Sequence, residues 1–191
     1  MGTSLKFALN VLKEGGAIAY PTDTVYGIGI SISYSENWLE KLSQIKRRPV
    51  DKPVSLAFSS VKSVMDFVEG DRFAELLNKF LPGPYTFIMR KSEDFDFPWE
   101  KVGVRVPEHE TAIKLAESGP VTSTSANLHK KKEAVVWREV NVDVDYILVG
   151  KCTHGAPSTV IDLEDGKVIR MGAGREKVKE IMEILDSVAH I

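Results

Sequence analysis

Cations and hydroxyl-bearing residues are gathered in a few short segments, and these are the groups that could bind a negatively charged substrate. The segment KRRPVDK, residues 46–52, contains three basic residues besides Arg47, and Arg170 ends a late apolar run. Residues 122–127, TSTSAN, offer four hydroxyls and an amide. Neutral donors and acceptors at this density suit the binding of a nucleotide or an amino acid. The cations could supply a positive field for the same ligand.

Each of these segments also has a purely structural explanation. The basic cluster could be a solvated helix end, where cations complement the helix dipole. The threonines and the aspartate of YPTDTVYG, residues 20–27, could close a turn by bonding to the backbone. Arg105, in a strand that is otherwise valine and glycine, could form a buried pair with a carboxylate, and Ser158 could cap a strand. Without further information, these explanations remain open.

The motifs of common nucleotide enzymes and hydrolases are absent from the sequence. There is no GxxxxGK[ST] or HExxH, and neither GIGIS nor MGAGR completes GxGxxG. Ser125 lacks a GxSxG context. Cys152 is the only cysteine, which excludes an internal disulfide and a cysteine-based zinc site and fits a reducing compartment. A nucleotide site in this chain must therefore be unconventional.

Length and charge limit the function further. With 191 residues, 43% of them hydrophobic, the chain is expected to form one domain over residues 1–191. Its formal charge of -2 disfavours a protein whose main task is to bind nucleic acid. No signal peptide and no apolar run of membrane-spanning length is apparent, so we expect a cytoplasmic protein without a membrane partner.

Apolar spacing and turn residues predict intermixed helices and strands. We expect helices that begin near Thr3 or Ser4 and near Ser35, with further helical segments at 61–80, 111–117 and 178–188. Strands are predicted at 17–20, 54–58, 85–90, 102–106, 121–123, 145–149, 158–163 and 167–170. Asp165 and Gly166 predict a two-residue hairpin turn. The fold class is therefore α/β, with one mixed, twisted sheet flanked by helices.

Six segments in order resemble one known family. They are YPTDTVYG, KRRPVDKPVSL, LPGPYTFIMRK, VGVRVPEH, STSAN and PSTVIDL, the last followed by IRMG. Together they resemble the YrdC-like family of threonylcarbamoyl-AMP synthases over nearly the whole chain. The resemblance implies a YrdC-like fold with a concave basic cleft.

The implied reaction joins L-threonine, bicarbonate and ATP into threonylcarbamoyl-AMP, with magnesium as cofactor and pyrophosphate and water as the other products. The product serves tRNA modification, through downstream threonylcarbamoyl transferase partners. The resemblance implies three groups of site residues: Lys46 and Arg48 for catalysis; Arg48, Lys52, Ser125, Asn127 and Arg170 for ATP; and Thr24, Arg105, Ser125 and Ser158 for threonine. It assigns no magnesium ligand.

Two other functions remain as alternatives. The basic cleft could belong to a module that binds double-stranded RNA or tRNA without catalysis, and weak RNA binding could accompany the enzyme activity. A carbamoyl-adenylate-forming domain of a larger system would keep the ATP residues and use another acceptor. One departure from the family lies at Leu128–Lys132, LHKKK, where members commonly have serine and glycine, so the lid over the nucleotide is expected to differ.

Overall fold

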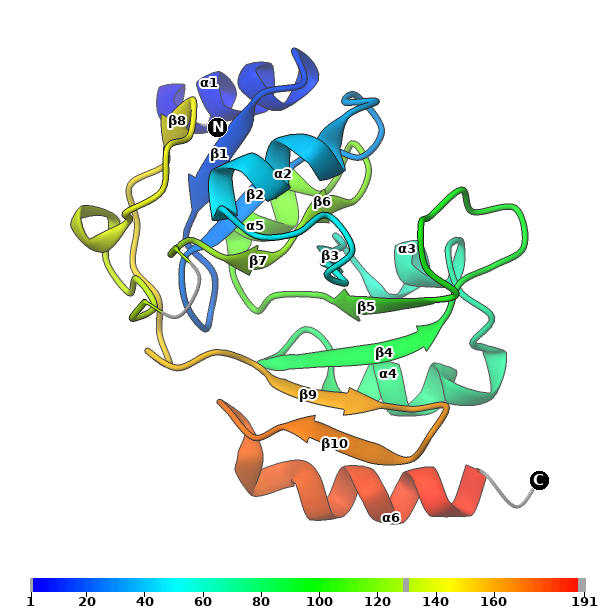
Figure 1. Cartoon of the computed structure of the whole chain (residues 1–191). Helices are drawn as coiled ribbons and strands as arrows, with labels where there is room; N and C mark the ends of the chain where they lie inside the picture. Colours follow the sequence, from blue (N-terminus) through cyan, green and yellow to red (C-terminus); the bar gives the residue numbers. More distant parts are fainter. Residues whose placement is uncertain (1, 129–130, 189–191) are drawn as a thin grey trace.

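The strands of the protein form two separate sheets, as seen in the computed structural model (Figure 1), which describes residues 2–128 and 131–188. The smaller sheet has the order β7-β2-β1-β8, and the larger has the order β10-β9-β4-β5-β3-β6. The strands of the smaller sheet are β1 (Ala17–Tyr20), β2 (Gly27–Ile30), β7 (Thr124–Ser125) and β8 (Tyr146–Ile147). Those of the larger are β3 (Ser55–Ala57), β4 (Tyr85–Arg90), β5 (Lys101–Arg105), β6 (Val121–Thr122), β9 (Thr159–Asp162) and β10 (Lys167–Arg170).

Helices cover both faces of the smaller sheet and one face of the larger. The helices are α1 (Thr3–Lys13), α2 (Trp38–Lys46), α3 (Val61–Met65), α4 (Ala74–Phe80), α5 (Glu110–Leu115) and α6 (Val178–Val188). Short 3-10 helices occur at Asp71–Phe73, Trp137–Glu139 and Arg175–Lys177. On β1, Ile18 and Tyr20 pack with α1 and α5, whereas Ala17 and Ala19 pack with α2 and its neighbours. Burial on both faces explains why this strand is apolar throughout.

The larger sheet has one apolar face, which packs against α3, α4 and α6 (Figure 1). Because side chains alternate along a strand, Phe87 of β4, Val104 of β5 and Ile161 of β9 point to this core. Their neighbours Thr86 and Arg105 must then point to the opposite face. That opposite face is the one that forms the site described below.

The two sheets meet where β6 ends and β7 begins. Thr122 pairs with Leu56 in the larger sheet, and Thr124 pairs with Ile28 in the smaller. The Thr122 hydroxyl also donates to the Ile28 carbonyl at 2.8 Å and accepts from the Ile30 amide at 3.0 Å. The TSTSAN segment therefore lies at the junction of the sheets, because the chain crosses from one to the other within it.

The predicted mixed α/β class is confirmed, but several local predictions are wrong. The strands divide between two sheets rather than forming one, and β2 was not predicted. Helix α1 has Gly2 as its N-cap and α2 has Asn37, and neither helix has a side-chain cap bond.

The predicted two-residue turn between the last strands is also wrong. It is a four-residue connection, residues 163–166, between the paired residues Asp162 and Lys167. Asp162 Oδ1 accepts the amides of Glu164 and Asp165, each at 3.0 Å, and thereby shapes the longer loop.

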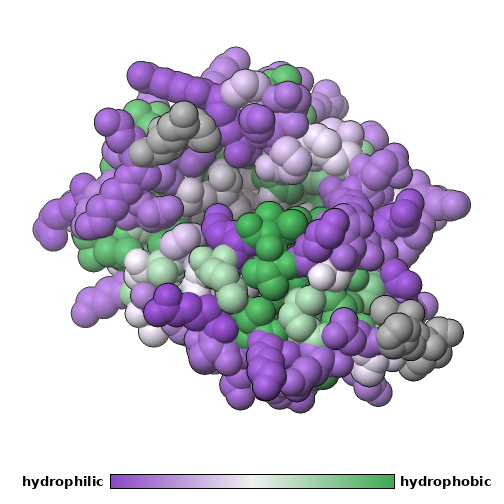
Figure 2. Space-filling model, turned by 60° about the horizontal axis from the view of Figure 1, so that its bottom comes forward, coloured by the Kyte–Doolittle hydropathy of each residue, from purple (hydrophilic) through white to green (hydrophobic). Residues whose placement is uncertain are grey.

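The face of the molecule seen in Figure 2 is largely hydrophilic. Figure 2, which views the molecule from the side of α6, shows apolar side chains gathered in the middle of a largely polar face. Over residues 2–128 and 131–188, no helix has the length and apolar character needed to cross a bilayer.

Candidate active site

A cavity of about 210 Å³ lies on the uncovered face of the larger sheet, and both sheets contribute to its walls. It is lined by Thr24, Val25, Arg48, Pro53, Val54, Ser55, Thr86, Arg105, Ser123, Thr124, Ser125, Pro157, Ser158, Val160 and Arg170. Six of the nine predicted site residues are among them: Thr24, Arg48, Arg105, Ser125, Ser158 and Arg170. Hydroxyls and guanidinium groups dominate this lining, so the cavity suits a polar, anionic ligand.

Strand alternation explains how the floor of the cavity is made. Ser55, Thr86 and Arg105 come from three adjacent strands and all lie on the face opposite the apolar core. Gly103 occupies the same face between them, and a Cβ there would lie 2.5 Å from Ser55 Oγ. The absence of a side chain at Gly103 therefore leaves room for the cavity floor.

The connection between β1 and β2 forms a structural turn and also contributes a residue to the cavity. These are the two roles that the sequence left open. The Thr22 hydroxyl donates to the Val25 carbonyl at 2.7 Å and accepts the Thr24 amide at 3.1 Å, which closes the turn. Thr24 lines the cavity, and its hydroxyl accepts a hydrogen bond from Arg105 Nη1 at 3.1 Å. A turn held by Thr22 thus presents Thr24 to the site.

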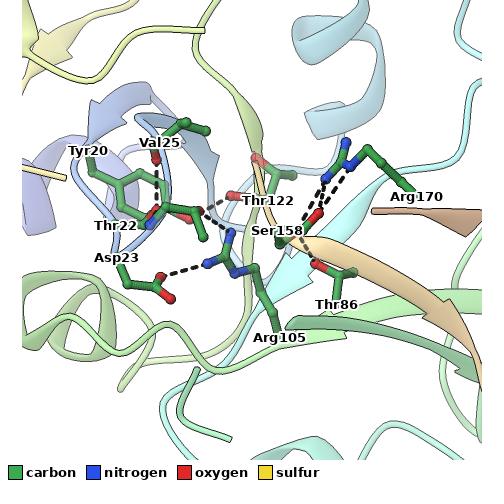
Figure 3. A network of polar contacts seen from close by, with 10 residues as sticks. Tyr20, Thr22, Asp23, Val25, Thr86, Arg105, Thr122, Ser158 and Arg170 are labelled. Carbon is green, nitrogen blue, oxygen red and sulfur yellow. Dashed lines mark hydrogen bonds and ion pairs between the residues drawn. The ribbon is translucent and has the colours of Figure 1, made fainter. Parts of the chain in front are cut away.

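Arg105 forms the buried ion pair that the sequence allowed as an alternative. Its Nη2 lies 2.7 Å from Asp23 Oδ1, and the two side chains are 6% and 2% exposed. Arg105 also lines the cavity, whereas Asp23 does not. The guanidinium therefore has a structural partner on one side and the cavity on another (Figure 3).

A second polar network in the cavity lining joins Arg170, Ser158 and Thr86. Arg170 donates to the Ser158 carbonyl from Nε at 3.0 Å and from Nη2 at 2.9 Å (Figure 3). The Ser158 hydroxyl lies 2.8 Å from the Thr86 hydroxyl and accepts from Arg170 Nη2 at 3.2 Å. Burial lowers the pKa of Arg170 from its usual value, although its guanidinium stays charged in any physiological buffer.

Arg48 reaches the cavity because α2 ends abruptly. Arg47 adopts a left-handed backbone with φ of 50°, and this conformation terminates the helix. The chain then turns, so that Arg47 is exposed and Arg48 lines the cavity. Burial lowers the pKa of Arg48. In the part of the chain that the structure describes, Arg48 and Arg170 form no ion pair, so their charges are available to a ligand.

Three predicted residues lie outside the cavity lining. Lys46 is 4% exposed, and its ammonium donates to the carbonyls of Ser125 and Asn127 and to Asn127 Oδ1. Burial, with a smaller contribution from Arg48, lowers the pKa of Lys46 to about 8. Asn127 is buried, and its amide donates to the carbonyls of Leu128 and Lys131. Lys52 is exposed to solvent.

Lys46 therefore links the end of α2 to the residues that follow β7. All three contacts of its ammonium, the longest at 3.4 Å to Asn127 Oδ1, are made within the protein. Within the predicted lid Leu128–Lys132, residues 129 and 130 lie outside the described residues.

Several lining residues carry no role in the sequence-based prediction. The sequence gives no function to Thr86 in LPGPYTFIMRK and predicts Ser55 only as part of a strand. A hydroxyl residue inside an otherwise apolar strand is the signal that could identify them, because such a residue must face a polar surface or find a buried partner. For Asp23 the sequence predicts only a role in the turn.

Comparison with known proteins identifies the family. The family model Sua5_yciO_yrdC, described as "Telomere recombination", matches residues 10–172. A Methanocaldococcus jannaschii protein, provisionally named a threonylcarbamoyl-AMP synthase, is 32% identical over 178 residues, or 89% of this chain and 85% of the relative. The threonylcarbamoyl-AMP synthase of Pyrococcus abyssi is 32% identical over 197 residues, or 96% of this chain and 58% of the relative.

A solved structure agrees with these sequence matches. The crystal structure of P. abyssi Sua5 complexed with L-threonine superposes with a TM-score of 0.83 at 29% identity, covering 93% of this chain and 56% of that one. The chain thus spans little more than half of the P. abyssi protein. The family match and the relatives at 32% identity lead to one conclusion: the chain belongs to the Sua5/YciO/YrdC family.

Proposed function

We propose that the protein is an L-threonylcarbamoyladenylate synthase, which makes threonylcarbamoyl-AMP from L-threonine, bicarbonate and ATP and releases pyrophosphate and water. The observation that carries the proposal is the cavity, which gathers Thr24, Arg48, Arg105, Ser158 and Arg170 from distant parts of the chain. The names of the relatives and the threonine complex of P. abyssi Sua5 support the same reaction.

Two polar networks line the cavity: Arg105 with Thr24, and Arg170 with Ser158 and Thr86. We assign the first network to threonine, whose carboxylate a guanidinium binds in its plane. We assign the second network, with Arg48 and the hydroxyls of residues 123–125, to ATP.

In the proposed reaction the threonine amine and bicarbonate first form a carbamate and water. A carbamate oxygen then attacks the α-phosphorus of ATP, and the bond to the bridging oxygen of pyrophosphate breaks. Both reactants are anions, so the fixed charges of Arg48 and Arg170 reduce the repulsion between them and stabilise the charge that develops at phosphorus. Arg105 holds the threonine carboxylate away from this centre. Lys46 contributes indirectly, because its ammonium holds the chain at Ser125 and Asn127.

The described residues do not form a magnesium site from protein ligands alone. Over residues 2–128 and 131–188, no group of three or more His, Cys, Asp or Glu side chains could hold a metal ion. Magnesium bound to nucleotides is commonly held through the phosphates. We therefore propose that magnesium enters as part of the substrate, and we assign no residue as its ligand.

We further propose that residues 1–191 act as one catalytic domain, since both sheets contribute to the cavity. We also propose that its product passes to a downstream transferase that modifies tRNA, and that the reaction takes place in the cytoplasm. The alternative of a non-catalytic RNA-binding module is less well supported, because a small cavity lined by hydroxyls suits a small molecule better than a phosphate backbone.

One experiment tests the proposed function directly. The protein is mixed with ATP, magnesium, bicarbonate and threonine, and the products are identified by mass spectrometry. We expect threonylcarbamoyl-AMP and pyrophosphate, both dependent on threonine. When ammonium replaces threonine as the amine, formation of carbamoyl-AMP would instead indicate the domain of a larger system. The lack of any adenylate with either amine would contradict enzyme activity.

A further inference from the structure

The Asp23 carboxylate lies directly behind Arg105 and outside the cavity. Asp23 is 1% exposed, and Oδ1 lies 2.7 Å from Arg105 Nη2. Within the described residues, Asp23 Oδ2 has no hydrogen-bond partner, and neither has Arg105 Nε. The carboxylate therefore has one close polar contact, and that contact is with a side chain that lines the site.

The position of Asp23 is fixed by its own backbone. Its carbonyl oxygen accepts the amides of Thr153 at 3.0 Å and His154 at 2.8 Å. The preceding residue, Thr22, closes the turn through its hydroxyl. Because these hydrogen bonds hold the main chain of Asp23, its carboxylate has a fixed position beside Arg105.

The pair also connects the two sheets. Asp23 belongs to the connection between β1 and β2 in the smaller sheet, and Arg105 is the last residue of β5 in the larger. Arg105 Nη1 donates to Thr24 of the same connection, so two neighbouring residues hold both terminal nitrogens. Figure 3 shows the bond to Asp23. These two contacts fix the plane of the guanidinium as well as its position.

We propose that Asp23 is a positioning residue for the amino-acid substrate, acting only through Arg105. A carboxylate binds a guanidinium best when it lies in the same plane, and long side chains lose affinity when that plane is free to rotate. Asp23 and Thr24 set this plane before the substrate arrives, and the remaining N–H groups of Arg105 are left for the threonine carboxylate. This inference rests on the proposed function, since it takes threonine to be the ligand of Arg105.

The first test is Asp23→Asn, which keeps the shape of the side chain and removes its charge. We expect the KM for threonine to rise at least tenfold, while kcat at saturating threonine stays within threefold and the KM for ATP is unchanged. A general loss of structure would lower kcat and disturb ATP binding as well. Asp186→Asn, on the exposed side of α6, is the matched control and should alter none of these values.

The second test is a double-mutant cycle, which stays informative even if Asp23→Asn alone fails to fold. In the combined Asp23→Asn and Arg105→Gln variant no buried charge is left without a partner. If Asp23 acts through Arg105, the double variant and Arg105→Gln alone will have the same KM for threonine. A further rise in the double variant, or an unchanged KM in folded Asp23→Asn, would overturn the inference while wild-type synthesis still upheld the proposed function. Wild-type protein that makes no threonylcarbamoyl-AMP would refute both.

Discussion

The most direct test of the site electrostatics is to remove the positive charge of Arg48. Arg48→Met keeps most of the aliphatic side chain and deletes the guanidinium. A cation about 4 Å from a phosphate oxygen, at an effective dielectric constant of about 20, contributes about 4 kcal/mol. Arg48 is only partly buried, so solvent and salt reduce this figure to about 2 kcal/mol. We therefore expect kcat/KM for ATP to fall about 30-fold.

The assay is steady-state pyrophosphate release in the presence of threonine and bicarbonate. Arg47→Met is the matched control, because it removes the same charge one residue earlier, from a side chain that is exposed and does not line the cavity. It should change kcat/KM less than threefold, and both variants should keep the wild-type melting temperature. Equal losses in the two variants would show that net charge, and not the placement of Arg48, controls ATP use. The assignment of Arg48 would then be refuted.

Three further predictions concern residues in or near the cavity. The pKa of Lys46 is lowered from 10.5 to about 8, so between these pH values the unfolded chain holds a proton that the folded chain lacks, and stability rises with pH. Relative to Lys46→Met, the wild-type free energy of unfolding in urea should increase by about 2 kcal/mol from pH 7.5 to 9.5, and a decrease would contradict the lowered pKa. Arg170→Lys loses the paired donation to the Ser158 carbonyl, so the KM for ATP should rise about tenfold in the pyrophosphate assay; an unchanged KM would exclude a role in ATP binding. Thr22→Val leaves the buried Val25 carbonyl and Thr24 amide without their partner, which should cost about 2–3 kcal/mol in urea denaturation; a loss below about 0.5 kcal/mol would mean that the turn closes without the hydroxyl.

The α/β class could be predicted because the patterns that indicate helices and strands are local in the sequence. The alternation in β4 and β5 and the apolar spacing of α6 can be seen within single segments, and each marks one face of an element. The division into two sheets could not be predicted in this way. It depends on which strands pair, and β6 pairs with β3, more than sixty residues earlier in the chain.

The same distinction applies to the site. Motif order brought Thr24, Arg48 and Arg170 into one prediction, and the structure places them around one cavity. The location of Lys46 could not be predicted, because its acceptors are mostly backbone carbonyls 79 and 81 residues away, which no residue type reveals. The pairing of Asp23 with Arg105 is equally remote, at 82 residues. The sequence offered the pair only as one of two explanations for a buried arginine.

The passage of TSTSAN from one sheet to the other has a consequence for how activity is acquired during folding. Neither sheet alone encloses the cavity, since Thr24 and Ser125 come from one and Thr86 and Arg105 from the other. A chain emerging from the ribosome cannot complete the site until Arg170 has been synthesised, after all the other residues of the cavity. Enzymatic turnover would therefore require both sheets to be folded and packed against each other. In a refolding experiment, the rate at which product formation appears would give the rate of the slowest of these steps.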